Sequence, residues 1–189
     1  MKEYLELLKE IYENGINSND RTGVGTRSLF GHQYRADLSK GFPLLTTKKM
    51  AIKAITTELM WFMKGRSDVQ YLQEHNCKIW NEWATEEACA RFGREEGDLG
   101  PIYGHQWRNF GGKQWQKTEN GWIKDASGFD QIKWLINEIN TNPDSRRLLV
   151  TGWNPKEANK VALPPCHTVW QVYVRNNKIS LKLYQSSGE

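Results

Sequence analysis

The stretch HTVWQVYVRNNKISLKLYQ, residues 167–185, decides the fold class. Both of its halves are rich in β-branched and aromatic residues, which predicts strands over residues 167–175 and 178–185. Asn176 and Asn177 separate the halves, and asparagine tolerates the positive φ angles of a two-residue turn. The sequence therefore predicts an antiparallel hairpin in this region.

Segments upstream of the hairpin have helical periodicity. Apolar residues recur three or four positions apart, which predicts helices over residues 1–15, 50–65, 67–76 and 128–142. The predicted apolar face of the second helix consists of Ile52, Ile55, Leu59, Phe62 and Met63. For the third helix, Ser67 is the expected N-cap.

Two further strands are expected over residues 27–38 and 146–153. Residues 80–128 show no clear period, and a loop of that length is usually functional or mobile. Because helices and strands do not alternate strictly, we expect an α+β fold that forms one domain over residues 1–189.

The composition is that of an ordinary globular chain, with 38% hydrophobic and 25% charged residues. A net charge of +4 suits a phosphate-bearing small molecule and does not require nucleic acid. Three cysteines without paired spacing argue against a disulfide framework and against a metal site. The sequence has no signal-peptide pattern and no apolar run of about 18 residues, so we expect a cytoplasmic protein that does not span a membrane.

The segment LPPCH, residues 163–167, allows two interpretations of Cys166. The thiolate is the reactive form of cysteine and nearby cations favour it, so Cys166 is a candidate nucleophile. The alternative is a small buried residue at the start of a strand. His167 is not automatically the base for Cys166, because neighbours in a strand point to opposite faces.

Three arginines are candidate anion ligands. Arg146 and Arg147 open a predicted strand, and paired guanidinium groups suit phosphate oxygens, although a solvated strand end is the alternative. Arg21 precedes Gly23 and Gly25, whose backbone amides could face an anion, although a plain turn is the simpler interpretation.

Two side chains are candidates for proton transfer. Glu58 lies in the most apolar helix, where burial would raise the pKa of its carboxyl, although a helix rim facing water is the alternative. Tyr103 lies in GDLGPIYGHQW, residues 97–107, where the phenol either faces a cavity or belongs to a turn. Nine tryptophans add a further choice between core packing and stacking on a flat ligand.

Nine blocks, taken together and in order, resemble the thymidylate synthase family from Met1 to about Ser187. They are NDRTGVGT, FGHQYR, GFPLLTTKK, ELMWFMKG, IWNEWA, GDLGPIYGHQWR, NPDSRRLLV, LPPCH and KLYQSS. The resemblance implies a thymidylate synthase-like sheet with flanking helices. It also implies conversion of dUMP to dTMP, with 5,10-methylenetetrahydrofolate as the one-carbon and hydride donor and with no metal.

The same resemblance assigns roles to individual residues. Cys166 is implied as the nucleophile that adds to C6 of the pyrimidine, with Glu58 and Tyr103 completing the catalytic set. The residues implied to bind the nucleotide are Arg21, Arg146, Arg147, His167, Gln185, Ser186 and Ser187. Those implied to lie on the folate side are Trp80, Trp83 and Glu189. The paired arginines would reach the site of a second subunit, which implies a homodimer.

Three positions depart from the family pattern. Ser186 stands where the family has an arginine, Glu189 where it has an aspartate, and Ala51 where a histidine is common. A charge-assisted hydrogen bond from the missing arginine would contribute roughly 1.5–3 kcal/mol. The family also continues beyond the last hairpin, so we expect a chain that lacks the C-terminal part and turns dUMP over poorly.

Three other functions are open at this point. A pyrimidine nucleotide hydroxymethylase of the same fold would add water in place of hydride. A nucleotide- or RNA-binding form with little or no turnover would fit Ser186, although the intact LPPCH segment weighs against it. A purely structural module gives no reason for Cys166 to occur together with Arg146 and Arg147.

Overall fold

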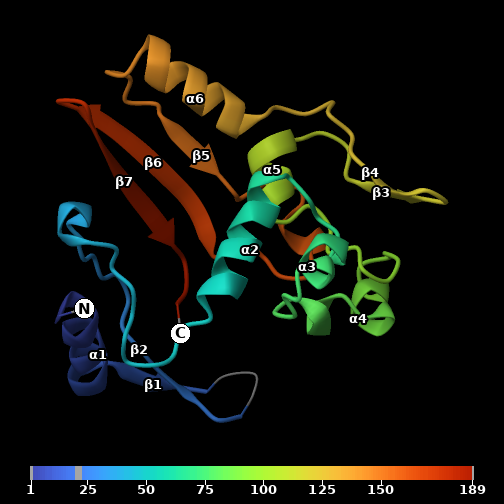
Figure 1. The fold of residues 1–189 in the computed structure, drawn as a ribbon. Helices are drawn as coiled ribbons and strands as arrows, with labels where there is room; N and C mark the ends of the chain where they lie inside the picture. Colours follow the sequence, from blue (N-terminus) through green and yellow to red (C-terminus); the bar gives the residue numbers. More distant parts are fainter. Residues whose placement is uncertain (1, 20–22, 189) are drawn as a thin grey trace. The chain divides into compact units, whose positions relative to one another are not determined.

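The computed structural model describes residues 2–19 and 23–188. The chain divides into two compact units, Met1–Ala51 and Ile52–Glu189. Figure 1 shows helices together with small antiparallel sheets, which agrees with the expected α+β class. None of the described helices combines the length and the apolar character needed to cross a membrane.

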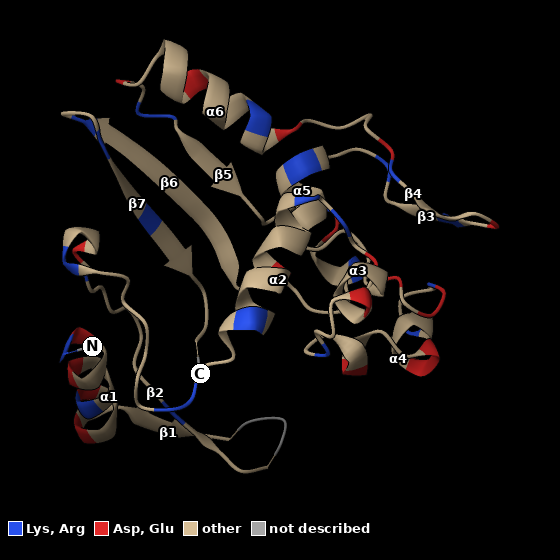
Figure 2. Ribbon diagram, viewed as in Figure 1, with Lys and Arg blue, Asp and Glu red and all other residues tan. Residues whose placement is uncertain are grey.

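The first unit contains one helix and a short two-stranded sheet. Its elements are α1 (Lys2–Asn14), β1 (Ile16–Ser18), β2 (Thr26–Ser28) and the 3-10 turn η1 (Leu38–Lys40). The predicted first helix is confirmed, and Figure 2 shows charges of both signs along it. Two ion pairs stabilise this exposed helix, Lys2–Glu6 and Lys9–Glu13. In each pair the lysine and the glutamate are one helical turn apart.

The predicted strand over residues 27–38 is wrong beyond Ser28. The residues that follow form no strand, and Phe30 and Tyr34 expose 100% and 55% of their surface. An amphipathic strand needs a partner and a covered apolar face. Within this unit β2 pairs with β1 over only three residues, so alternation of residue types alone was not sufficient to form a longer strand.

The second unit holds five helices, two 3-10 turns and five strands among its described residues. The helices are α2 (Ile52–Met63), α3 (Gln70–Glu74), α4 (Glu86–Ala90), α5 (Tyr103–Asn109) and α6 (Gln131–Thr141). The 3-10 turns are η2 (Asn81–Trp83) and η3 (Ala158–Lys160). The strands are β3 (Gln116–Thr118), β4 (Gly121–Ile123), β5 (Leu149–Thr151), β6 (His167–Arg175) and β7 (Lys178–Gln185).

The hairpin of β6 and β7 has the bounds that the sequence predicted. Asn176 and Asn177 have φ angles of 50° and 55°, in the left-handed region that a two-residue hairpin turn requires. β5 pairs with the other edge of β6 and is shorter than the strand predicted there. The register places His167 opposite Gln185, so both residues lie at one end of the sheet.

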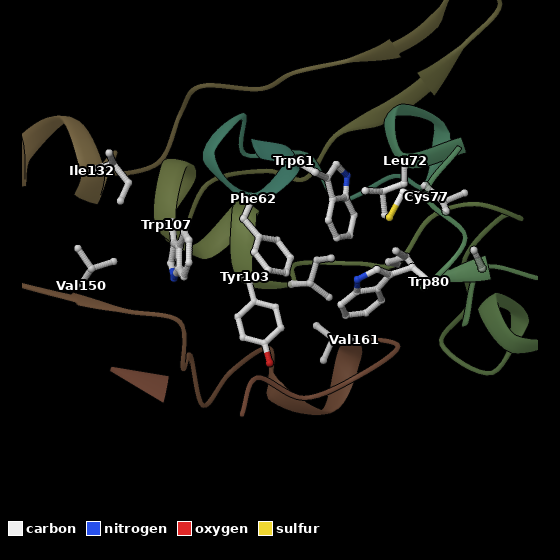
Figure 3. Close-up of a cluster of buried hydrophobic side chains, with 14 of the residues drawn as sticks. Trp61, Phe62, Leu72, Cys77, Trp80, Tyr103, Trp107, Ile132, Val150 and Val161 are labelled. Atoms are coloured by element: carbon white, nitrogen blue, oxygen red, sulfur yellow. The ribbon is translucent and has the colours of Figure 1, made fainter. Parts of the chain in front are cut away.

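The predicted apolar face of α2 is confirmed at its C-terminal end, where Phe62 is buried and Met63 packs against the core, and is wrong in the first two turns. Trp61 and Phe62 are buried, whereas Ile52, Ile55 and Leu59 are largely exposed. Large aromatic rings bury more apolar area than aliphatic side chains and pack edge to face with one another. Figure 3 shows the aromatic cluster that results, which contains Trp61, Phe62, Trp80, Tyr103 and Trp107.

α5 is a buried helix within the segment that was expected to be irregular. Six of its seven residues are buried, so α5 has no exposed polar face. Its sequence therefore lacks the alternation of polar and apolar faces by which the other helices were predicted. Gly104 allows α5 to approach α2 closely, because a Cβ there would lie 2.9 Å from the carbonyl oxygens of Phe62 and Arg66. The crossing of these two helices fixes Tyr103 relative to α2.

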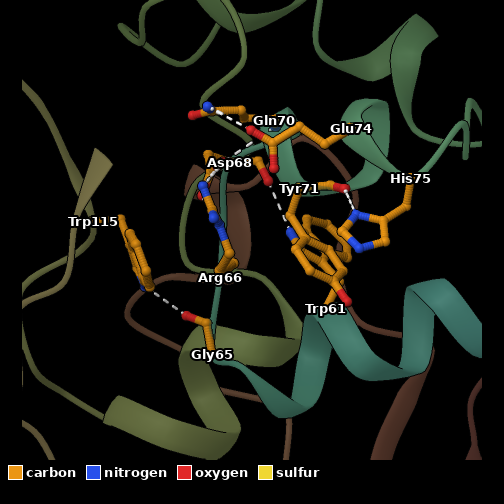
Figure 4. A network of polar contacts seen from close by, with 9 residues as sticks. All are labelled: Trp61, Gly65, Arg66, Asp68, Gln70, Tyr71, Glu74, His75 and Trp115. Carbon is orange, nitrogen blue, oxygen red and sulfur yellow. Dashed lines mark hydrogen bonds and ion pairs between the residues drawn. The ribbon is translucent and has the colours of Figure 1, made fainter. Parts of the chain in front are cut away.

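The carboxylate of Asp68, and not the predicted Ser67, accepts the amide of Gln70 at the start of α3, at 3.1 Å. Asp68 also receives two hydrogen bonds from Arg66, at 2.8 and 2.6 Å (Figure 4). The Arg66 guanidinium lies 5.0 Å from the ring centre of Trp115. This network joins the end of α2 to the segment that leads into β3.

Candidate active site

Cys166 lies directly before β6 and is half-buried. Its backbone amide donates a 2.8 Å hydrogen bond to the Oη of Tyr103. Its Sγ lies 3.4 Å from the Oγ of Ser187 and 3.9 Å from the carbonyl oxygen of Pro164. Cys166 is thus partly exposed, whereas Cys77 and Cys89 are buried.

Tyr103 is the first residue of α5, and its ring is enclosed by aromatic neighbours. The ring centre lies 4.8 Å from that of Phe62 and 5.6 Å from that of His167. Burial raises the pKa of the Tyr103 phenol, and the backbone amides of Cys166 and His167 partly offset this effect. Negative charge on Cys166 and on Glu58 raises the pKa of the same phenol further.

Glu58 on α2 is paired with an indole from the start of η2. The Nε1 of Trp80 donates to the Oε1 of Glu58 at 2.6 Å. Burial raises the pKa of the Glu58 carboxyl, and the Trp80 hydrogen bond lowers it by a smaller amount. The expectation of a raised pKa, made from the apolar neighbours of Glu58, agrees with this position.

The residues at and just after the end of β7 contact Cys166. The amide of Ser186 donates to the carbonyl oxygen of Cys166 at 2.9 Å, and the Nε2 of Gln185 donates to the carbonyl oxygen of Ser187 at 2.6 Å. Burial lowers the pKa of His167, and a hydrogen bond with the Gln185 side chain partly restores it. The structure thus places these predicted nucleotide-binding residues next to Cys166 or to one another.

Arg146 and Arg147 are not part of this cluster. They precede β5 and are exposed, and the carbonyl oxygen of Arg146 accepts a 2.9 Å hydrogen bond from the side chain of Gln171. Gln171 lies four residues along β6 from His167, which is roughly 13 Å in a strand. Within one chain, the paired arginines are therefore distant from the cysteine.

The predicted folate-side residues lie in different environments. Trp80 is buried and bonded to Glu58, whereas Trp83, in the same 3-10 turn, is half-buried. Arg21 and Glu189 lie outside the described residues, so their predicted roles stay predictions.

Phe62 and Trp107 support the site without having been proposed for it. Trp107 follows Tyr103 by one helical turn on α5, and their ring centres lie 6.4 Å apart. Phe62 also lies 5.6 Å from Trp107, so the three rings restrain one another. The spacing of Tyr103 and Trp107 would have signalled this contact if α5 had been recognised as a helix.

The second unit therefore presents a partly exposed cysteine, a buried phenol at its amide, and a carboxyl whose pKa is raised by burial. Such a set can form a covalent bond to an electrophilic carbon and move protons beside it. The family model described as thymidylate synthase matches residues 2–189. That match spans nearly the whole sequence, and the chain belongs to the thymidylate synthase family.

Proposed function

We propose that this chain carries the chemistry of the reductive methylation of dUMP to dTMP, through a covalent bond between Sγ of Cys166 and C6 of the pyrimidine, with the poor turnover that its sequence leads us to expect. The family match over residues 2–189 supports a nucleotide methyltransferase in general. The observation that carries the specific proposal is the partly exposed Cys166, whose amide is bound to Tyr103 and whose Sγ faces Ser187.

Addition of the Cys166 thiolate to C6 makes C5 enolate-like, so that this otherwise poor carbon nucleophile can react. The co-substrate 5,10-methylenetetrahydrofolate supplies the one-carbon unit and the hydride. Once C5 has bonded to the one-carbon unit, the enzyme must remove the proton from C5 before the hydride is delivered. The Sγ–C6 bond then breaks, which releases the Cys166 thiolate and dTMP. The Tyr103 oxygen accepts the Cys166 amide and keeps its own O–H available, and Glu58 has a raised pKa suited to exchanging protons through water.

The proposal includes the ligand contacts that the resemblance implies. His167, Gln185 and Ser187 would contact the nucleotide, and their clustering around Cys166 supports this. Trp83 is half-buried, and its exposed part could stack on a flat pterin. Trp80 would lie on the folate side of the site as well, held there by its hydrogen bond to Glu58.

We also propose a cytoplasmic homodimer. Arg146 and Arg147 are exposed and lie far along the sheet from Cys166 of their own chain. A phosphate bound in a second subunit would give these two guanidinium groups an anionic partner.

A covalent-adduct experiment tests the proposal without requiring turnover. The protein is incubated with 5-fluoro-dUMP and 5,10-methylenetetrahydrofolate, and the intact mass is measured. We expect an added mass equal to both ligands, its loss in Cys166→Ala, and its retention in Cys77→Ala. An unmodified mass in the wild-type protein would contradict the proposal.

A hydroxymethylase is the second candidate, because the family contains such enzymes and the first covalent step is shared. Incubation with dUMP, and separately with dCMP, distinguishes the two by the mass of the product. We expect a methyl group on dUMP. A hydroxymethyl product would assign the chain to the second candidate.

A further inference from the structure

The polar surroundings of the Cys166 sulfur contain one acceptor and one potential donor. The carbonyl oxygen of Pro164, at 3.9 Å, can only accept a hydrogen bond and therefore favours the protonated thiol. The hydroxyl of Ser187, at 3.4 Å, can donate and therefore favours the thiolate. Among the described residues, no lysine or arginine side chain is hydrogen-bonded to this sulfur.

Ser187 is held at this distance by its neighbours. The Nε2 of Gln185 donates to the backbone carbonyl of Ser187 at 2.6 Å. Gln185 lies opposite His167 in the sheet register, at the end of the sheet that borders Cys166. The Ser186 amide binds the Cys166 carbonyl at 2.9 Å, which joins the end of β7 to the start of β6 beside the sulfur.

We propose that Ser187 is the hydrogen-bond donor that stabilises the Cys166 thiolate, and that Gln185 is the residue that positions it. The inference rests on the proposed function, in which Cys166 is the nucleophile. It gives the Ser187 hydroxyl a role at the reacting sulfur that is separate from nucleotide binding. A hydrogen bond to an ionised group is shorter and stronger than one between neutral groups, so the contact would tighten on ionisation.

Alkylation by iodoacetamide tests this role directly. The thiolate sulfur displaces iodide, forming the S–C bond as the C–I bond breaks, so the rate follows the thiolate fraction. The rate at Cys166 is measured from pH 6 to pH 10 by mass spectrometry of its peptide. We expect Ser187→Ala to move the midpoint of the profile upward by about half to one pH unit, a roughly three- to tenfold change in ionisation.

A matched pair isolates the hydroxyl from the shape of the side chain. Ser187→Thr keeps the donor and is expected to retain the wild-type midpoint, whereas Ser187→Val has nearly the same shape and is expected to behave as Ser187→Ala. Gln185→Ala is expected to give a smaller shift in the same direction. Ser180→Ala, on the exposed middle of β7, is the control that leaves the midpoint unchanged.

An unchanged midpoint in both Ser187→Ala and Ser187→Val would overturn the proposal. A downward shift would also overturn it, because the hydroxyl would then be accepting a hydrogen bond from the neutral thiol. If Ser187→Ala fails to fold, the threonine and valine variants still decide the question. The assay uses no nucleotide or folate, so an upward shift together with a missing 5-fluoro-dUMP adduct would refute only the proposed function.

Discussion

At the Glu58 carboxyl, two influences act in opposite directions. Burial raises the pKa from the ordinary value of 4.5, and the indole N–H of Trp80 lowers it by a smaller amount. A carboxyl whose folded pKa is raised binds its proton more tightly when the protein is folded. The folded state therefore loses stability as the pH rises from 4.5 through the folded pKa.

We accordingly expect Glu58→Gln to be more stable than the wild type at pH 7, because burial no longer acts on a charged carboxylate, and to reduce the remaining turnover of dUMP. The amide keeps an acceptor for Trp80 and removes the charge. Urea unfolding at pH 5 and pH 7 measures the effect, with a larger gain at pH 7. Glu82→Gln, exposed in η2, is the control. Lower stability of Glu58→Gln at pH 7 would contradict this account.

Ser186 offers a second prediction at this scale. Its amide and hydroxyl contact only the carbonyl of Cys166 among the described residues, so the side-chain position is open to substitution. Ser186→Arg would add the guanidinium that the family pattern has there. We expect dUMP binding roughly tenfold tighter by calorimetry, about 1.4 kcal/mol. Ser180→Arg is the control for added charge, and equal tightening in both variants would rule out a local phosphate contact.

Individual site residues were predictable to different degrees. The raised pKa of Glu58 follows from its apolar neighbours in one helix, which a sequence displays directly. Its partner Trp80 is 22 positions away, and their hydrogen bond depends on how α2 meets η2. Local pattern left the role of Cys166 open, because its contacts with Tyr103 and Ser187 join residues that are distant in sequence.

Between elements, the crossing of α2 and α5 leaves no room for a side chain at Gly104. A Cβ at Gly104 would lie 2.9 Å from two backbone carbonyl oxygens, which cannot rotate away as a side chain can. Alanine normally stabilises a helix relative to glycine by about 1 kcal/mol. We expect the opposite sign for Gly104→Ala, a loss of about 1–3 kcal/mol from overpacking.

Urea unfolding of Gly104→Ala measures that loss, and the rate of Cys166 alkylation reports any displacement of Tyr103. Gly93→Ala provides the comparison, since a Cβ there meets open space and the cost arises only from its φ angle of +66°. If Gly104→Ala were more stable than the wild type, α2 and α5 could move apart to admit the methyl group without a loss in the free energy of unfolding.

The predictability of an element depended on whether its pattern was periodic. β6 and β7 were predicted to the residue because β-branched runs flank a turn whose asparagines suit positive φ. α5 was missed because it is buried on nearly all sides and carries glycine, histidine and glutamine among its aromatics. The segment that appeared least regular therefore supplies Tyr103, which binds the backbone of the proposed nucleophile.

For the molecule as a whole, the buried His105 and the half-buried His167 connect folding stability to pH. Burial is the main cause that lowers the pKa of both His105 and His167 below 6.5. The Glu157 carboxylate and the backbone of Gly112 partly offset this at His105, as does Asp125, while Arg94 adds to the lowering. A base with a lowered folded pKa is protonated more readily in the unfolded chain. Stability is therefore complete above pH 6.5 and is lost as the pH falls below it.

We expect the free energy of unfolding to fall between pH 7 and pH 5 by at most about 1.4 kcal/mol per pH unit for each histidine. His105→Gln removes one titrating group and should flatten the profile, even if its stability at pH 7 is lower. His75→Gln, exposed at the end of α3, should keep the wild-type slope. Urea unfolding at half-unit pH steps gives the slopes. Parallel profiles for wild type and His105→Gln would contradict this account. They would mean that His105 binds its proton as readily in the folded protein as in the unfolded chain, so that burial does not govern its charge.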